Sequence, residues 1–565
     1  MNREAAPRAG EPPVLRAPET VMRLERLGAN HQTRLSFMRA LLRRLKAEGW
    51  RVTRPVWEID AKGVGRAVYV AEGPTRSYGL VAFAHDLPDD ERTDRVIAEA
   101  WDATFALFDG VPTAADLDRM AANVPLQEAG RCAPSELVLS RANRSVRLFA
   151  HVVDRLARGL QPERAELEKV GYLMRTTAVY GNGKFGIADR ERIADRPEFA
   201  GPFRAEMLAV WLIRAFTVDL AEHAARMLAP GTAVRLDPDL RRRLGVGNST
   251  GLGMAPFLVN HPALLHRWLL AKETALARVR AVEHAAPEAA ETFPRLVGRA
   301  RRTVGEWRVA DARYAGRIAR LEDDLARLSS WLEAGALDGP YPFDRLYRRA
   351  EEALSIEAQE LLVSLLLEPH GGLVDDLAET MSADEEAPAR IDGRMSLADL
   401  RRLIEDRYAW ALGVDYAKAE AQARFWYVSA EKLEPRLGER GRESGHELEQ
   451  PLAVGRDVAA LRRALGGAAG TESVAAFLLR HPEHRHVVRR VQLHATHPYA
   501  EIQGNLIDAG LVPLDLLRCK LAFFGASKFD PRSDRWLRIT MYQDAPYPDE
   551  LDRLPADDWC WTPAG

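Results

Sequence analysis

Cysteine and lysine are both scarce in this chain. Its 565 residues include three cysteines, which lie far apart and form no Cys-x-x-Cys pair. This spacing supports neither a disulfide framework nor a zinc site built from cysteines, and it favours a reducing compartment. Nine of the 79 basic residues are lysines, so arginine supplies most of the positive charge. We predict a cytoplasmic protein in which each lysine is of interest as a functional group.

Long apolar runs and an excess of either charge are also missing. The longest apolar runs, such as LLVSLLL at 361–367, are much shorter than the roughly 20 residues of a membrane-spanning helix. The first 20 residues contain no apolar core of the kind found in signal peptides. The 79 basic and 82 acidic residues nearly cancel, so no overall field attracts nucleic acid or an anionic membrane. We therefore predict neither as a partner.

Helical periodicity dominates the middle of the chain. Apolar residues recur at i, i+3, i+4 and i+7 in segments 135–160, 203–228 and 261–286, which predicts long amphipathic helices. The composition, 47% apolar and 28% charged, is that of a globular protein. We predict a mainly α fold, with a multi-helix central body and a long helical arm. Small α+β units with short antiparallel strands are expected at both ends.

Changes in periodicity divide the chain into four parts. Short β-branched or aromatic runs at 51–60, 65–73 and 76–86 predict a meander of three strands, followed by a helix at about 90–108. Segments 486–494 and 534–544 predict strands near the C-terminus. The predicted parts are a flexible tail (1–20), an α+β unit (21–115), a helical body (116–425) and a C-terminal α+β unit (426–565).

Residues 297–334 form the most strongly charged part of the helical body. Apolar residues recur there at helical spacing, and the turn DGPYP at 338–342 closes the segment. One interpretation is an exposed arm, or half of an antiparallel helical hairpin, that buries a partner subunit. The other is a helix that folds back on its own domain. From the first interpretation we predict a homo-oligomer.

Two glycine-rich segments, 174–193 and 241–268, interrupt the helices. Connections between helices usually need about 2–8 residues. Both segments are longer than that and contain more glycine and polar residues than a turn requires. Glycine allows the backbone to approach a ligand closely, and successive N–H groups can face an anion. Neither segment contains GK[ST], and the second follows a predicted helix instead of a strand. We therefore predict a site for a small anion and no nucleotide or redox cofactor.

Residues in or near these segments are the candidates for the chemistry. Histidine, lysine, tyrosine and glutamate side chains can transfer protons, and arginine can clamp a carboxylate through two hydrogen bonds. The predicted catalytic residues are His261, Lys184, Tyr180 and Glu128. The predicted substrate-binding residues are Arg175, Asn182, Asn248, Ser249, Thr250 and Arg131.

Histidines cluster near the C-terminus and suggest a different chemistry. His494, His497 and Glu501 are spaced i, i+3 and i+7, which would align three metal ligands on one continuous helix. Pro498 argues against that continuity, because the residue before a proline is disfavoured in the α conformation. A metal is therefore an alternative, and our main prediction includes no cofactor.

The leading hypothesis is an enzyme that acts on a small anionic or carboxylate-bearing metabolite by acid–base chemistry, of lyase or hydrolase type. Two alternatives stay open at this point. The chain can be a non-catalytic helical binding or scaffold protein whose glycine-rich segments are structural corners. It can also be a metal-dependent enzyme that uses the C-terminal histidines.

Overall fold

We describe the fold from a computed structural model of the chain. The described residues are 14–88, 100–126, 132–176, 193, 195–251, 258–259, 261–307, 311–381, 390–417, 454–503, 515–526, 528–531, 536–556 and 559. The chain divides into two compact units, which we call the helical unit and the sheet unit. The helical unit comprises Met1–Thr33, Gly251–Phe523 and Pro531–Trp536. The sheet unit comprises Arg34–Thr250, Phe524–Asp530 and Leu537–Gly565. The four-part division and the cytoplasmic location stay predictions.

A nine-stranded sheet organises the sheet unit. The strands are β1 (Arg51–Ile59), β2 (Gly65–Glu72), β3 (Ser77–Ala84), β4 (Ala103–Asp109), β5 (Glu136–Arg144), β6 (Tyr172–Thr176), β7 (Gly245–Gly251), β8 (Lys528–Pro531) and β9 (Trp536–Met541). Their order is β1-β2-β3-β4-β5-β6-β7-β9-β8. Each strand from β1 to β5 pairs with the next in antiparallel fashion, whereas β6 and β7 are parallel.

The first three strands confirm the predicted meander. The turn between β1 and β2 forms because the Asp60 carboxylate accepts hydrogen bonds from the backbone N–H groups of Lys62 and Val64, both at 2.9 Å. Gly63 adopts a φ of 80°, a conformation that favours glycine. These turn residues set the register in which Ile59 faces Gly65.

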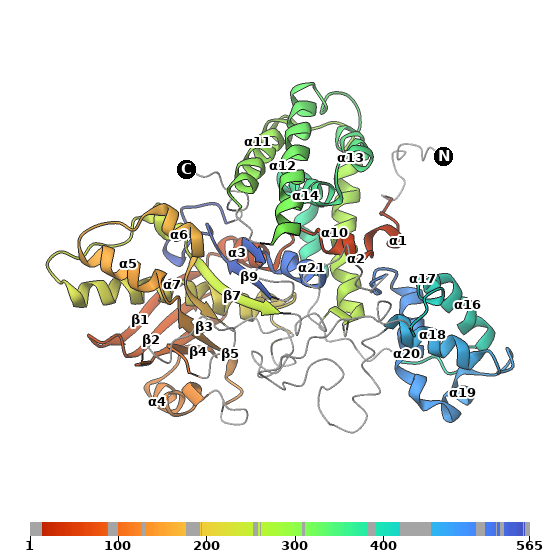
Figure 1. Cartoon of the computed structure of the whole chain (residues 1–565). Coiled ribbons are helices and arrows are strands. Elements are labelled where there is room, and N and C mark those ends of the chain that lie inside the picture. The colour runs from red at the N-terminus through yellow and green to blue at the C-terminus, as the bar shows by residue number, and fades with distance from the viewer. Residues whose placement is uncertain are drawn as a thin grey trace. The chain divides into compact units, whose positions relative to one another are not determined.

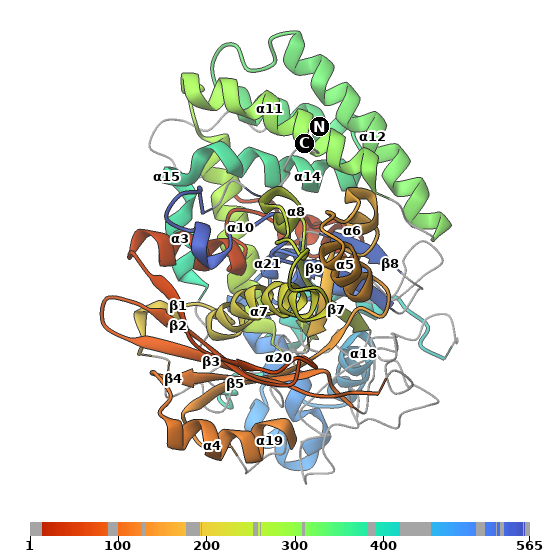
Figure 2. The ribbon, with the colours of Figure 1, turned by 90° about the vertical axis from the view of Figure 1, so that its left-hand side faces the viewer.

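Helices cover both faces of the sheet. Helix α7 (Arg204–Leu228) packs against strands β3 to β6, α3 (Phe37–Ala47) and α5 (Leu148–Ala157). Figure 2 shows the sheet curled around α7. Helix α4 (Ala114–Asn123) contributes Leu117 and Met120 to a core with side chains of β2, β3 and β4. The sheet is therefore a structural layer with a core on each side.

The prediction of a mainly α fold with only short strands is wrong. Helices outnumber strands among the described residues, but the curled sheet is the main architectural element of the sheet unit. Within the predicted helix 135–160, residues 136–144 form β5, and only α5 is helical. Residues 103–109 form β4 instead of a helix. The burial pattern explains the error, because β4 is buried on both faces and lacks the alternation of a half-exposed strand.

Five long helices form the body of the helical unit (Figure 1). They are α10 (Pro262–Arg280), α11 (Pro287–Glu306), α12 (Ala312–Glu333), α13 (Pro342–Ala353) and α14 (Ile356–Leu367). Helix α14 is buried along almost its whole length, which suits the apolar sequence LLVSLLL. Of the described helices, none has the length and apolar character to span a membrane.

Segment 297–334 includes the end of α11 and all of α12, which pack against each other as a helical hairpin. Both helices also contact α14. Val304 on α11 and Leu321 on α12 are fully buried, so the hairpin folds on its own unit. The structure thus has the hairpin of the first interpretation, and the hairpin packs on its own unit as in the second. The homo-oligomer stays a prediction.

A cluster of buried charges anchors residues 14–33 in the helical unit. The Arg16 guanidinium donates two hydrogen bonds to Glu273, at 2.6 and 2.7 Å, and one to Glu360 at 2.6 Å. Arg26 and Lys272 also donate to Glu360, at 2.8 and 2.5 Å. All five side chains are buried or nearly so. Glu360 is thus the shared partner of three cations.

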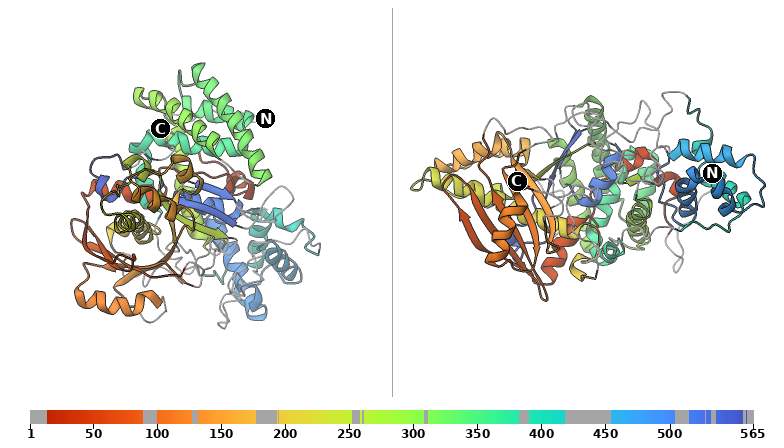
Figure 3. Two further views of the ribbon diagram at one scale, coloured as in Figure 1. Left: turned by 60° about the vertical axis from the view of Figure 1, so that its left-hand side comes forward. Right: turned by 90° about the horizontal axis from the view of Figure 1, so that it is seen from below.

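The C-terminal part of the helical unit is a group of short helices (Figure 3, cyan to blue). It contains α16 (Leu397–Arg407), α17 (Ala409–Leu412), α18 (Val454–Leu465), α19 (Val474–Arg480) and α20 (Arg485–Thr496). Ser396 and Ser473 cap α16 and α19 and form an antiparallel bridge with each other. Residues 485–496 are helical, so the predicted strand at 486–494 is wrong.

Candidate functional site

The second glycine-rich segment contains strand β7, and its first two glycines have structural roles. A Cβ atom at Gly245 would lie 2.3 Å from the carbonyl oxygen of Met541. At Gly247 it would lie 2.6 Å from ring atoms of Tyr172. Glycine inside a strand often marks such a close approach. These two glycines therefore allow β7 to pack, and they give no evidence of a ligand.

Gly245→Ala is expected to destabilise the protein by at least about 2 kcal/mol, because the backbone of Met541 cannot move aside as a flexible side chain can. Gly231→Ala is the matched control in the same unit, since no heavy atom outside its immediate chain neighbours lies within 4 Å of the added Cβ. Urea denaturation of both variants measures the effect. Equal midpoints for the two variants would contradict the packing role of Gly245.

The structure brings some of the predicted binding residues together on neighbouring strands. Arg175 on β6 pairs with Gly247 on β7, next to Asn248, whose side chain is buried. Ser249 and Thr250 follow on β7. Strands β6 and β7 thus place parts of the two glycine-rich segments side by side.

The other predicted catalytic and binding residues belong to the helical unit or lie outside the described residues. His261 is the N-cap residue of α10 and belongs to the helical unit. Tyr180, Asn182, Lys184, Glu128 and Arg131 lie outside the described residues. Their roles stay predictions.

The three predicted metal ligands lie within the described part of the helical unit. Both oxygens of Glu501 accept hydrogen bonds from Arg490, at 2.5 and 2.9 Å, and the Tyr408 hydroxyl donates to Oε2 at 3.1 Å. His494 packs against the Tyr408 ring, and burial lowers the pKa of its imidazole. Among the described residues, no group of three acidic, histidine or cysteine side chains is placed to hold a metal ion.

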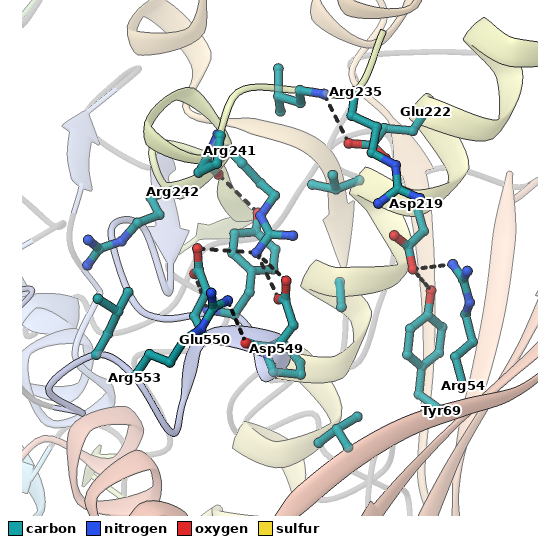
Figure 4. A pocket seen from close by; sticks show the side chains of 18 of the residues that line it. Arg54, Tyr69, Asp219, Glu222, Arg235, Arg241, Arg242, Asp549, Glu550 and Arg553 are labelled. Carbon is teal, nitrogen blue, oxygen red and sulfur yellow. Dashed lines mark hydrogen bonds and ion pairs between the residues drawn. The ribbon is translucent and has the colours of Figure 1, made fainter.

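A large cavity lined by both charged and apolar residues lies in the sheet unit and is a candidate site (Figure 4). Its volume is about 910 Å³, within the range of small-molecule pockets. Strands β1 and β2, helix α7, helix α8 (Pro238–Arg242) and the 3₁₀ turn η9 (Pro548–Glu550) line it. The charged lining residues are Arg54, Arg226, Arg235, Arg241, Arg242, Arg553, Asp219, Glu222, Asp239, Asp549 and Glu550.

Two carboxylates on α7, Asp219 and Glu222, lie one helical turn apart on one wall of the cavity. Asp219 accepts hydrogen bonds from the Arg54 guanidinium, at 2.6 Å, and from the Tyr69 hydroxyl. Glu222 accepts one from the Leu236 backbone N–H at 3.0 Å. Burial raises the pKa of Glu222, and the nearby charge of Asp219 raises it further. The two carboxylates thus have different surroundings.

Arg214 holds together the chain segments around the other wall. Its guanidinium donates to the carbonyl oxygens of Leu244 and Ala545, both at 2.7 Å, and of Arg242 at 3.0 Å. The side chain is completely buried, and burial lowers the pKa of its guanidinium. Three backbone carbonyl groups accept hydrogen bonds from this buried cation. Arg214 of α7 thus connects α8 and the segment before η9.

Tyr547 lies between two arginines in this wall. The Cζ atoms of Arg214 and Arg241 lie 3.8 and 4.3 Å from the centroid of its ring, on which both guanidinium groups can stack. Nη2 of Arg241 in turn donates to both oxygens of Asp549, at 2.8 and 3.0 Å, and lies 3.2 Å from Glu550. Figure 4 shows Arg241, Asp549 and Glu550 across the cavity from Asp219 and Glu222.

Some arginine side chains that line the cavity have no acidic partner among the described residues. Within the described part of the chain, the guanidinium groups of Arg226 and Arg235 have no hydrogen bond or ion pair. The Nε atoms of Arg241 and Arg242 are buried and have no hydrogen-bond partner among the described residues. Guanidinium groups prefer carboxylate and phosphate oxygens as partners. Among the described lining residues, Arg226 and Arg235 therefore keep their guanidinium donors open.

The cavity was not predicted from the sequence, although two signals point to it. The pair Asp219 and Glu222 sits at i and i+3 in a predicted helix, and three consecutive arginines, 241–243, precede the second glycine-rich segment. The residues from β1, β2 and η9 have no such signal, because only the tertiary fold brings them to the cavity.

No protein-family model, no curated protein and no solved structure matches the chain. The function is therefore inferred from the residues of the site.

Proposed function

We propose that the chain is an enzyme that acts on a small anionic metabolite in the cavity of the sheet unit, by acid–base chemistry of lyase or hydrolase type. The observation that carries the proposal is the combination of unpaired guanidinium groups with a carboxyl group of raised pKa in one cavity. Cavities that combine converging polar groups with shifted pKa values are typical of active sites.

Arg226 and Arg235 are the proposed anchors for the anion. Both are exposed at the cavity wall and have no ion-pair partner among the described residues, so an incoming oxyanion displaces no internal carboxylate from them. Charge-assisted hydrogen bonds to guanidinium are stronger than neutral ones, and they hold a carboxylate or phosphate in a defined orientation. The anchored anion would lie near Glu222, whose pKa Arg235 also influences.

Glu222 is the proposed proton donor and acceptor. A carboxyl group is an effective general acid or base when its pKa lies near the working pH, and burial moves Glu222 in that direction. Asp219, one turn away, contributes negative charge that favours the protonated form of Glu222. Arg54 and Tyr69 hold Asp219 in place.

Arg235→Gln is expected to abolish most of the thermal stabilisation that anions give the protein. The measurement is a thermal-shift screen of the full chain against inorganic phosphate, citrate and glucose 6-phosphate. Removal of one charge-assisted hydrogen-bond donor costs about 1.5–3 kcal/mol, which corresponds to an affinity loss of roughly 10- to 100-fold. Arg226→Gln is expected to act in the same direction.

Arg158→Gln is the matched control for this screen. Arg158 is an exposed arginine at the end of α5 in the same unit, it does not line the cavity, and its ion pair is with Asp154. Its substitution changes the net charge equally and is expected to leave the anion response unchanged. Stabilisation by anions that is equal in all three variants would contradict the proposed site.

A further inference from the structure

Asp549 already occupies the position on Arg241 that a ligand oxyanion would take. Both of its carboxylate oxygens accept hydrogen bonds from Nη2 of Arg241, at 2.8 and 3.0 Å. The same nitrogen lies 3.2 Å from Oε1 of Glu550. Three acidic contacts thus converge on one nitrogen atom, while the buried Nε of Arg241 has no partner among the described residues.

These contacts with Asp549 and Glu550 engage a single nitrogen atom of the Arg241 guanidinium group, Nη2. A carboxylate or phosphate binds arginine best through two parallel hydrogen bonds from two different nitrogens. Asp549 reaches only one of them. Its side chain is also 60% exposed, and exposed ion pairs contribute little net stability. A ligand anion that uses two nitrogens can therefore replace Asp549 at small cost.

Glu550, the neighbouring acid, has a different role. Its Oε2 atom accepts a hydrogen bond from the backbone N–H of Tyr547 at 2.8 Å, and its side chain is 8% exposed. Glu550 therefore stabilises the turn that carries both acids. The backbone carbonyl of Asp549 accepts a hydrogen bond from Arg553 at 3.0 Å. The Asp549 side chain can rotate away while these contacts keep its backbone in place.

We propose that Asp549 is an affinity-determining residue that competes with the ligand anion for Arg241. This inference depends on the proposed function, because it assumes that the cavity binds an anion. In the free protein, Asp549 neutralises part of the positive charge of the cavity. When an oxyanion binds, it takes the Arg241 donors and the Asp549 carboxylate turns to solvent. With competition of this kind, the apparent affinity equals the intrinsic affinity multiplied by the fraction of molecules in which Asp549 does not contact Arg241.

Asp549→Asn is expected to tighten the binding of inorganic phosphate to the full chain by about two- to fivefold, in line with the small energy of an exposed ion pair. Isothermal titration calorimetry at low ionic strength measures this change. The matched control is Asp239→Asn, since Asp239 also lines the cavity and is exposed, but forms no ion pair with a described residue. It removes the same charge and is expected to change the affinity by less than Asp549→Asn.

The outcomes separate this inference from the proposed function. If wild type binds phosphate and Asp549→Asn binds it equally or more weakly, competition by Asp549 is excluded while the anion site stands. An equal gain in both aspartate variants also excludes competition, because it shows a general effect of charge. If neither wild type nor Asp549→Asn binds phosphate, the proposed anion site fails, and this inference fails with it.

Discussion

Glu222→Gln is expected to lower turnover by at least about 100-fold, because general acid–base catalysis by a positioned side chain contributes about 10²–10⁴-fold. Glutamine has almost the same size as glutamate, and its side-chain oxygen can still accept the hydrogen bond from Leu236. It cannot transfer a proton. The measurement is steady-state kinetics on the substrate that the anion screen identifies, with the larger change expected in kcat and the smaller in KM.

Glu72→Gln provides the control for this experiment. Glu72 is an exposed residue at the end of β2, and it does not line the cavity. Its substitution is expected to leave both kinetic constants within about twofold of wild type, as is usual for surface changes away from a site. A kcat for Glu222→Gln similar to that of Glu72→Gln would exclude Glu222 as the proton-transfer group.

The pH dependence of stability tests the pKa of Glu222 independently of turnover. Burial and Asp219 raise this pKa above its usual 4.5, so the folded protein holds the proton more tightly than the unfolded chain. The stabilisation from this proton is complete below pH 4.5 and is lost as the pH rises through the raised pKa. Glu222→Gln removes this loss. The free energy of unfolding of Glu222→Gln should therefore exceed that of wild type by an amount that grows as the pH rises above 4.5. Below pH 4.5 the two proteins should not differ in this way.

Glu360→Gln is expected to destabilise the helical unit by about 3–5 kcal/mol, the usual cost of breaking a buried ion pair from one side. Glu360 is the shared acceptor of Arg16, Arg26 and Lys272. The neutral amide would leave these three cations with Glu273 as the remaining carboxylate in the cluster. Urea denaturation, followed by circular dichroism, measures the effect.

The contribution of Glu360 to stability changes with pH in the opposite direction to that of Glu222. Burial by itself raises the pKa of a carboxyl group, but the charges of Arg16, Lys272 and Arg26 together hold the pKa of Glu360 well below its usual 4.5. Its contribution to stability is therefore present above pH 4.5 and is lost as the pH falls through the lowered pKa. The difference between wild type and Glu360→Gln should shrink in acid.

Glu352→Gln is the matched control on α13, where Glu352 is exposed and forms no ion pair with a described residue. It is expected to change the free energy of unfolding by less than about 0.5 kcal/mol. A loss in Glu360→Gln no larger than this would show that the buried cluster does not anchor residues 14–33.

Local signals in the sequence predicted some elements of the fold and not others. The strands β1 to β3 were predictable because the turn at Asp60 and Gly63 is made by neighbours in sequence. Strand β4 was not, because it is buried on both faces and shows no alternation. Helix α20 is short and rich in valine, a composition that favours a strand, and tertiary packing overrides that preference.

The site illustrates the same limit. A glycine required for close packing and a glycine in a ligand loop look alike in sequence, and the neighbour that requires Gly245 is Met541, far along the chain. The pair Asp219 and Glu222 could have been predicted from helical spacing alone. Only the tertiary fold shows that Asp549 accepts a hydrogen bond from Arg241 and that Asp219, Glu222, Arg241 and Asp549 line one cavity.

The most direct test of the central claim is calorimetric titration of the full chain with the strongest anion from the screen, in wild type, in the double variant Arg226→Gln/Arg235→Gln and in Arg158→Gln. The proposed site predicts one bound anion per chain in wild type and in Arg158→Gln, and affinity at least about 100-fold weaker in the double variant. Binding by the double variant that is as tight as in wild type would place the anion elsewhere and contradict the proposed site.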